Sequence, residues 1–535
     1  MIEPAVGNGT GRRPAHDLVP LCLAGLSLAL LFSVVVIHLR FAVLPVVFLA
    51  LGLASYLWNS RKALYMFLFL LPLINSAPDL FPNGYPFNCM AISLFYLSGL
   101  AAAALLKGER LEFSFPGRGP YLLFLALLGV SVIFVFLRWS NLAVAPAAFL
   151  RDTPVAPSGE RVSFAAIFPT VSLALFALAP WTASLLRRRG MEEDQVFLPL
   201  KLGFCLSFLL AVLQRWAYPE LLAPGWWSER LKQVNGGFSD FNAFGFFAGA
   251  LFLHQSLCLA NGSPRRATTA AADGLPRSRQ WRNRLFDFIF MPVALGAIFL
   301  SGSRTAFLFV ILALFVILFS RTIKAGPKLL IVIFLLAALA VAGGTLRVRL
   351  ERTAEQAALA MRARDNFRSW DQVSNCRLAL LRDSVAMISR FPLSGVGAGN
   401  FLFYLNDLHF DDEAYRDLPL NQYLLVFSET GVFAGMAFAA FMLLLLMRLR
   451  PGRTRIVVAA MALALLLNHF FWFPECLLLF WIVVARGEWA DGPAAGKRWA
   501  WAAALILAVF IAANLADFRS LHPATWALEK GKPYF

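Results

Sequence analysis

Long apolar runs alternate with short polar segments along almost the whole chain. Each run has about 20 residues, the length that an α-helix needs to cross the hydrocarbon core of a bilayer. The first run extends from Leu18 to Ile37 behind a short basic leader, and no small-residue cleavage site follows it, so we interpret it as a retained signal anchor. The pattern predicts an all-α polytopic integral membrane protein with about 14 transmembrane helices, in a range of roughly 12–15.

The charges of the polar segments predict which side of the membrane each segment faces. When the segments are assigned to alternating sides, the short basic ones all fall on one side, which the positive-inside rule identifies as the cytoplasm. These basic segments are 61–62, 107–118, 187–189, 265–284, 321–328, 448–455 and 486–498. The N-terminus is then cytoplasmic, and the periplasmic side receives 138–162, 214–242, 301–304, 347–420 and the tail from Asp517.

This map divides the chain into regions along its length. They are the N-terminal transmembrane helices in 1–200, the transmembrane helices in 201–346 with the periplasmic loop 214–242, the large periplasmic loop 347–420, and the C-terminal transmembrane helices with a short periplasmic tail in 421–535. The large loop places apolar residues at helical spacing in 347–364 and again in 377–390. This spacing predicts two amphipathic helices on the outer face of the membrane. In the second, the apolar face has Leu378, Leu381, Val385 and Ile388, and the polar face has Arg382, Asp383 and Arg390.

Composition excludes two classes of protein. The chain has 535 residues, of which 59% are hydrophobic and only 15% charged, so it is not a soluble globular protein. The formal net charge of +17 is spread over the loops between the spans, so we expect no nucleic-acid partner. Most of the six cysteines, among them Cys258, lie in apolar runs, where a cysteine is usually a small core residue. No CxxC or HExxH spacing is present, so we expect no metal site and no cofactor.

Arg304 is a candidate for binding an anion. It lies at the predicted outer start of a span, where the positive-inside bias and the helix dipole both disfavour a cation. Ser301 or Ser303 can cap this helix and leave backbone N–H groups pointing outward, which together with the arginine predicts a phosphate site. In the alternative, Arg304 extends to the lipid headgroups or pairs with Glu429.

Glu429 and Arg377 are two further candidates. Glu429 lies about 12 Å along a span that begins at Asn421, and an ionisable residue at that depth indicates either a functional site or a structural pair, with a buried arginine as its partner. Arg377 begins the second amphipathic helix, where a solvated interfacial cation is the alternative to a functional one. In the periplasmic loop 226–242, we expect Arg230 and Lys232 to bind substrate. They lie near paired tryptophans that either form an interfacial belt or stack on sugar rings.

Four segments, taken in order, resemble one family of bacterial membrane enzymes. GGFSDFNAFG, SGSRTA, CRLALLRDSVAMISRFPLSGVGAGNF and LNQYLLVFSETGVFAG are similar to motifs of the O-antigen ligase and O-antigen polymerase superfamily. Their order and approximate spacing agree over residues 230–480. Members of this superfamily transfer lipid-linked glycans at the periplasmic face of the inner membrane.

The resemblance implies roles for individual residues. Arg304 and Arg377 would hold the diphosphate of an undecaprenyl-diphosphate-linked glycan donor, and Asn421 and Tyr423 would contact substrate. The chain departs from the ligases at Leu420, where they have the proposed general-base histidine. An aliphatic side chain cannot accept a proton. The candidates for a base near this position are His409, the acidic residues at 411–417 and Glu429.

The resemblance therefore predicts a glycosyltransferase that polymerises lipid-linked oligosaccharide repeat units at the periplasmic face of the bacterial inner membrane. Its partners would be the glycan donor, a glycan acceptor and membrane lipids, with a chain-length regulator as a further candidate. The residue at 420 favours a polymerase over a ligase that transfers the glycan to lipid A core. A transporter of lipid-linked sugars is the third interpretation, and the gathering of polar residues on the outer side argues against it.

Overall fold

A computed structural model of the chain describes the residues given next. They are 43–73, 87–109, 115–140, 161–218, 233–238, 240–260, 277–319, 328–329, 333, 354–355, 357–362, 370–371, 373–374, 377–401, 404, 420–489, 497–518 and 520–521. The regular structure within these residues is helical, apart from one isolated antiparallel bridge between Leu449 and Trp489. The predicted all-α class is therefore confirmed.

The helices appear in the following order. They are α2 (Val43–Trp58), α3 (Ser60–Leu70), α4 (Phe87–Leu106), α5 (Arg118–Ser140), α6 (Arg161–Arg188), α7 (Glu193–Trp216), α9 (Phe241–Ala260), α11 (Arg277–Ser301), α12 (Ala306–Phe319), α15 (Arg377–Arg390), α17 (Gln422–Arg448), α18 (Arg453–Ala464), the 3-10 helix η6 (Phe470–Trp472), α19 (Pro474–Ala485) and α20 (Lys497–Ala516).

Among the described residues, 5 helices are long and apolar enough to cross a membrane. They belong to α5, α7, α9, α17 and α20, and shorter apolar helices accompany them. The chain is thus a helical membrane protein. The number of about 14 spans stays a prediction, and the predicted first span, 18–37, lies outside the described residues.

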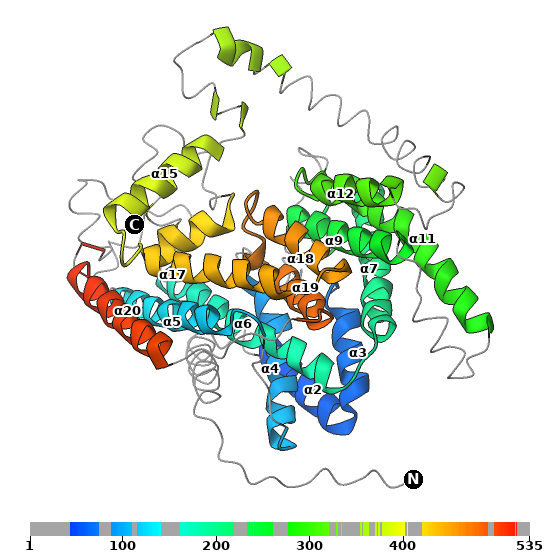
Figure 1. Cartoon of the computed structure of the whole chain (residues 1–535), viewed down its shortest axis with the longest axis horizontal. Coiled ribbons are helices and arrows are strands. Elements are labelled where there is room, and N and C mark those ends of the chain that lie inside the picture. The colour runs from blue at the N-terminus through cyan, green and yellow to red at the C-terminus, as the bar shows by residue number, and fades with distance from the viewer. Residues whose placement is uncertain are drawn as a thin grey trace.

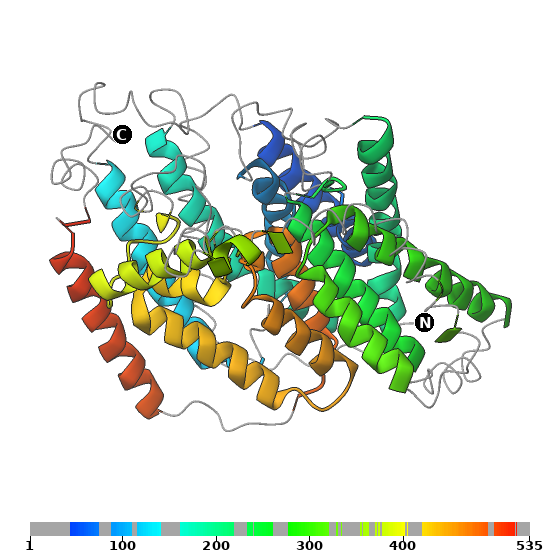
Figure 2. The ribbon, with the colours of Figure 1, turned by 90° about the horizontal axis from the view of Figure 1, so that it is seen from above.

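Helices α2, α3 and α4 pack together and contact α6 and α7, and most of the other helices form two groups (Figures 1 and 2). In the first group α5 packs on α6, α17 and α20, and in the second α9 packs on α11 and α12, with α7 against α11. Helices α18 and α19 lie between the groups, because α18 contacts α9 and α19 contacts α6. Helix α9 is buried along most of its length, so its apolar surface faces protein and not lipid.

Two glycines fix the position of α12 on α9. Gly245 and Gly249 are one helical turn apart, the small-xxx-small spacing that lets membrane helices approach closely. A Cβ at Gly245 would lie 2.6 Å from the Ser301 Oγ, and one at Gly249 would lie 2.7 Å from the Phe309 ring. The close approach places the turn that contains Arg304 beside the N-terminal end of α9.

The predicted helix at 377–390 is confirmed as α15, which packs on α17. Its apolar residues Leu378, Leu381 and Val385 are exposed, at 36–49% of their surface. Asp383, which we assigned to the polar face, is instead buried against the protein. Helix α15 therefore buries a mixed face, which includes Leu380, and leaves Leu378, Leu381 and Val385 uncovered by the described residues. Of the other predicted helix, residues 354–355 and 357–362 are described, and they are helical.

Candidate functional site

Helix α17 is broken at Gly431. This residue has φ 73° and ψ 177°, whereas the residues on either side continue as helix. The conformation lies in a region that L-residues rarely adopt, and a Cβ at this position would overlap the carbonyl oxygen of Leu393. Only glycine fits here, because both the backbone angle and the close approach of another segment require it.

The segment that approaches the break is residues 392–401, which we name the glycine loop. Its backbone forms hydrogen bonds with the N–H and C=O groups of α17 that have lost their helical partners at the break. Val396 N–H donates to the Ser428 carbonyl at 2.9 Å, and Gly397 N–H donates to the Glu429 carbonyl at 2.8 Å. In the opposite direction, Val432 N–H donates to the Pro392 carbonyl at 2.8 Å. The loop therefore replaces the lost helical hydrogen bonds, which must be satisfied inside a membrane protein.

Glu429 lies at the centre of this junction and is 4% exposed. Its Oε1 accepts a hydrogen bond from Phe401 N–H at 3.3 Å, and the carboxylate also accepts one from Gly399 N–H. We expected a buried arginine as its partner. In the part of the chain that the structure describes, backbone amides of the glycine loop hold the carboxylate in place of an arginine. Glu429 thus ties the loop to α17.

Arg138 lies beneath the glycine loop and is fully buried. Its Nη1 donates to the Val396 carbonyl at 3.4 Å, and its Nη2 donates to Asn514 Oδ1 at 3.2 Å. The residue is in the last turn of α5, where the helix dipole favours a cation. Its Nε has no hydrogen-bond partner among the described residues. Sequence reasoning missed Arg138, although an arginine at the predicted outer end of a span is the signal that singled out Arg304.

Further contacts fix the glycine loop to α5 and to the end of α20. Ala398 N–H donates to Ser131 Oγ at 2.9 Å, and Ser394 Oγ donates to Asp517 Oδ2 at 2.6 Å. Asn400 differs from these residues, because it is fully buried and its Oδ1 and Nδ2 find no hydrogen-bond partner within the described residues. A buried amide without partners costs about 1–3 kcal/mol, so this side chain is suited to bind a polar group that enters the site.

Arg304 is exposed in the turn that precedes α12. Ser303 N–H donates to Ser301 Oγ at 3.1 Å, and Gly302 adopts φ 62°. The Ser303 Oγ is buried without a hydrogen-bond partner in the described structure, so this hydroxyl makes no capping bond there. The serines thus shape the turn, and the arginine extends from it.

Arg377 is the first residue of α15, and its helix end is capped by the chain itself. Ser374 Oγ accepts from Arg377 N–H at 3.1 Å, and Asp371 Oδ1 accepts from Ala379 N–H at 2.8 Å. Helix α15 packs on α17, whereas α12 packs on α9 and α18. The two predicted phosphate-binding arginines therefore come from different helix groups.

Asn421 is the N-cap of α17. Its Oδ1 accepts from Tyr423 N–H at 2.9 Å and from Leu424 N–H at 3.1 Å, so its amide nitrogen is the group that remains for a substrate. Tyr423 donates its hydroxyl to the Ala462 carbonyl at 3.4 Å. The other predicted site residues, His409, Arg230 and Lys232, lie outside the described residues.

The long apolar helices, one of them broken around a buried carboxylate, define an α-helical integral membrane protein with a polar site at one end of its helices. Residues 289–439 of this chain match the family model described as O-antigen ligase. The match confirms the predicted resemblance to the O-antigen ligase and polymerase superfamily. It includes Arg304, Arg377, the glycine loop and Glu429, and it excludes Arg138. No curated protein and no solved structure gave a significant match.

Proposed function

We propose that this chain is a glycosyltransferase that polymerises undecaprenyl-diphosphate-linked repeat units at the periplasmic face of the bacterial inner membrane. The observation that carries the proposal is the family match at 289–439, which contains both candidate arginines and the junction between the glycine loop and α17. In the reaction, a hydroxyl of the acceptor glycan attacks the anomeric carbon of the donor glycan. The bond to the diphosphate breaks, the diphosphate leaves with the lipid carrier, and the proton of the attacking hydroxyl passes to the leaving diphosphate or to solvent.

The arginines would stabilise the charge that develops on the leaving diphosphate. Fixed cations aimed at developing charge are among the largest contributions to catalysis. The exposed apolar side chains of α15 support this role, since a helix with uncovered leucines lies at the membrane interface. Arg377 would then be at the depth of the lipid headgroups, where the diphosphate of a lipid carrier is found.

Arginines and helix N-termini can replace the metal ion that many sugar transferases use to hold a diphosphate, so we propose metal-independent chemistry at this site. The test is activity of the purified protein after chelation. Transfer that disappears with the chelator and returns with a divalent ion would contradict this part of the proposal.

The polymerase is proposed over the ligase because Leu420 stands where the ligases have their proposed general base. The alternatives are a ligase that transfers the glycan to lipid A core and a transporter that moves lipid-linked sugars without changing a bond. The polar residues of the junction lie near the predicted outer end of the helices, and this position favours surface chemistry over transport.

Deletion of the gene, followed by analysis of glycans on the lipid carrier and at the cell surface, tests the proposal. Wild type should restore long chains, whereas Arg377→Ala at matched membrane abundance should leave single repeat units. Arg382→Lys is the control, because Arg382 is on the same helix with its side chain 55% exposed, and a lysine keeps the positive charge that faces the buried Asp383. Long polymer accumulating on the carrier would identify a ligase, and unchanged glycans would contradict both transferase interpretations.

A further inference from the structure

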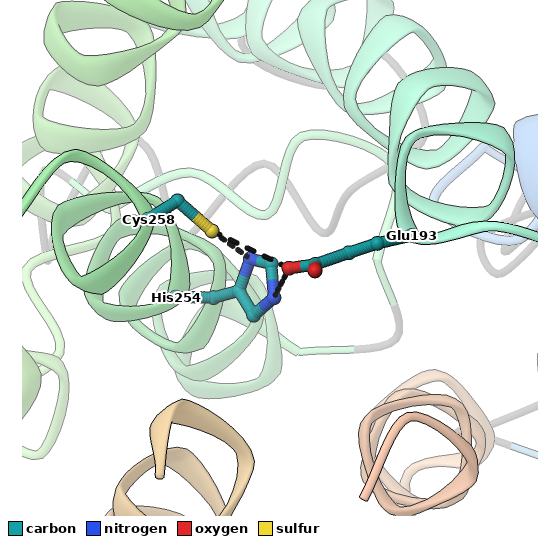
Figure 3. Close-up of side chains that lie close together, drawn as sticks. All are labelled: Glu193, His254 and Cys258. Atoms are coloured by element: carbon teal, nitrogen blue, oxygen red, sulfur yellow. Dashed lines mark hydrogen bonds and ion pairs between the residues drawn. The ribbon is translucent and has the colours of Figure 1, made fainter. Parts of the chain in front are cut away.

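A second polar cluster lies at the far end of α9 from Arg304. Gly245 is beside the turn of Ser301 and Ser303, and Cys258 follows thirteen residues later, about 20 Å along the helix. His254 and Cys258 are four residues apart on α9 and face Glu193, the first residue of α7 (Figure 3). The positive-inside bias of the neighbouring segments assigns this end of the helices to the cytoplasm.

The three side chains bring an oxygen, a nitrogen and a sulfur donor close together. His254 Nε2 lies 3.1 Å from Glu193 Oε1, and Cys258 Sγ lies 3.4 Å from the same oxygen. Cys258 Sγ is 3.8 Å from His254 Nδ1. Zinc bound tetrahedrally by these atom types keeps neighbouring ligand atoms about 3.3–3.8 Å apart. The described structure therefore gathers one donor atom from each of the three side chains within 4.8 Å of one another, with one imidazole nitrogen beside the carboxylate and the other beside the thiol (Figure 3).

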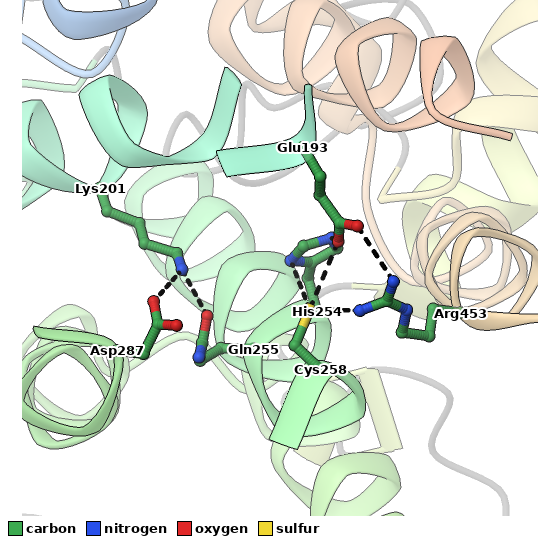
Figure 4. Close-up of polar contacts among 7 residues, drawn as sticks. All are labelled: Glu193, Lys201, His254, Gln255, Cys258, Asp287 and Arg453. Atoms are coloured by element: carbon green, nitrogen blue, oxygen red, sulfur yellow. Dashed lines mark hydrogen bonds and ion pairs between the residues drawn. The ribbon is translucent and has the colours of Figure 1, made fainter. Parts of the chain in front are cut away.

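The surroundings hold the donors in place. Arg453 donates from Nη2 to Glu193 Oε2 at 3.0 Å, so the other oxygen, Oε1, is the one that faces His254 and Cys258 (Figure 4). The Nη1 of Arg453 lies 3.1 Å from Cys258 Sγ. The ring of Phe197 stacks on His254, with 3.9 Å between ring centroids. Groups that hydrogen-bond or pack on metal ligands in this way fix their orientation.

Of the two neighbouring cations, Arg453 contacts the anionic ligands themselves, whereas Lys201 is paired elsewhere. Lys201 Nζ lies 2.8 Å from Asp287 Oδ1 and also contacts Gln255, so this ammonium group is neutralised by its own carboxylate (Figure 4). A thiolate and a carboxylate bring two negative charges, which balance a divalent cation. The donor set includes sulfur and nitrogen, and such sets favour zinc and similar transition metals over magnesium or calcium.

We propose that Glu193, His254 and Cys258 form a binding site for a borderline-soft divalent cation of the zinc class, separate from the glycan-transfer site. As the metal–sulfur bond forms, the Cys258 thiol releases its proton to solvent, and His254 binds through one neutral ring nitrogen. The imidazole must turn for this step, because its two nitrogens now face different partners. The ion links α7 to α9, with Arg453 of α18 bound to both anionic ligands.

Metal binding to the purified full-length protein tests the site. The affinity tag is removed, the protein is stripped with a chelator, and Zn²⁺ or Co²⁺ is then added. We expect about one tightly bound zinc per chain, and for cobalt a thiolate charge-transfer absorption with the strong visible bands of a tetrahedral site. The cobalt spectrum reports sulfur ligation in the unaltered protein, so this readout does not depend on the folding of a variant.

Two cysteine variants complete the experiment. Cys258→Ser should abolish the charge-transfer absorption and weaken zinc binding by more than about 100-fold. Removal of a residue that only hydrogen-bonds to a metal ligand weakens binding by at most about 100-fold, so a larger effect indicates loss of a ligand. Cys205→Ser is the matched control, because Cys205 is a partly buried cysteine on α7 outside the cluster. Absence of zinc from the folded wild-type protein would overturn the proposal and leave a network of charges. Zinc retained by Cys258→Ser, or a cobalt spectrum without sulfur ligation, would also overturn it.

Discussion

The two ends of the described helix bundle present polar groups in different ways. At the glycine loop, a helix is broken and a buried carboxylate is held by backbone amides. At the far end of α9 the helices are regular, and side chains from α7, α9 and α18 contact one another directly. The first arrangement depends on backbone shape, and the second depends on side-chain chemistry. The backbone pairing at the glycine loop lies within residues 392–432, whereas the side-chain cluster draws on residues as far apart as Glu193 and Arg453.

Gly431→Ala should have the largest effect of the changes considered, since it acts on backbone shape. Alanine at positive φ is strained by about 1–3 kcal/mol, and overlap with the Leu393 carbonyl adds a similar overpacking cost. We expect a loss of about 3 kcal/mol or more in unfolding free energy and no long glycan chains. Thermal unfolding in detergent and glycan analysis in cells measure the two effects.

Gly452→Ala is the control for this change. Gly452 has an extended backbone, and the nearest atom to an added Cβ is 4.0 Å away. It should therefore behave as wild type. A stable and active Gly431→Ala variant would show that the break in α17 is not required, and the contrast between the two ends would then disappear.

Substitution of one carboxylate at each end tests whether the ends are independent. The Glu429 carboxylate accepts hydrogen bonds from two backbone N–H groups. In Glu429→Gln, the new NH₂ group faces one of these donors and cannot accept its hydrogen bond, so about 1–3 kcal/mol of stability is lost. We expect this variant to lose long glycan chains and to retain zinc. Glu193→Gln should show the reverse, with weakened zinc binding and normal glycans. If each variant impairs both readouts, the two ends are coupled.

The features that could be predicted from the sequence are those encoded locally. Apolar runs predicted the long helices, apolar spacing predicted the bounds of α15, and the ordered motifs predicted the family that matches at 289–439. Each depends on residues that are close together in the chain. For this reason the amino-acid sequence alone was enough to predict the helical class and to assign Arg304 and Glu429 to a family segment.

The contacts that the sequence did not predict join distant segments. Glu429 meets amides of the glycine loop, and Arg138 of α5 meets Val396 more than two hundred residues away. In the cluster at the far end of α9, only the spacing of His254 and Cys258 is a local signal, and neither Glu193 nor Arg453 is near them in sequence. Pairing of this kind is set by how helices pack, which periodicity along one segment does not reveal.

Asn400→Ala should have the smallest effect on stability and separates structure from function within the glycine loop. Neither polar atom of this buried amide has a hydrogen-bond partner in the described residues, so its removal breaks no such bond and should change the unfolding free energy by less than about 1 kcal/mol. If the amide binds a sugar hydroxyl or a phosphate oxygen, glycan transfer should nevertheless fall by about tenfold, which corresponds to about 1.4 kcal/mol in the transition state. Transfer kinetics with purified donor, measured beside thermal unfolding, distinguish these effects. A large loss of stability would instead make Asn400 a packing residue, and unchanged transfer would remove it from the site.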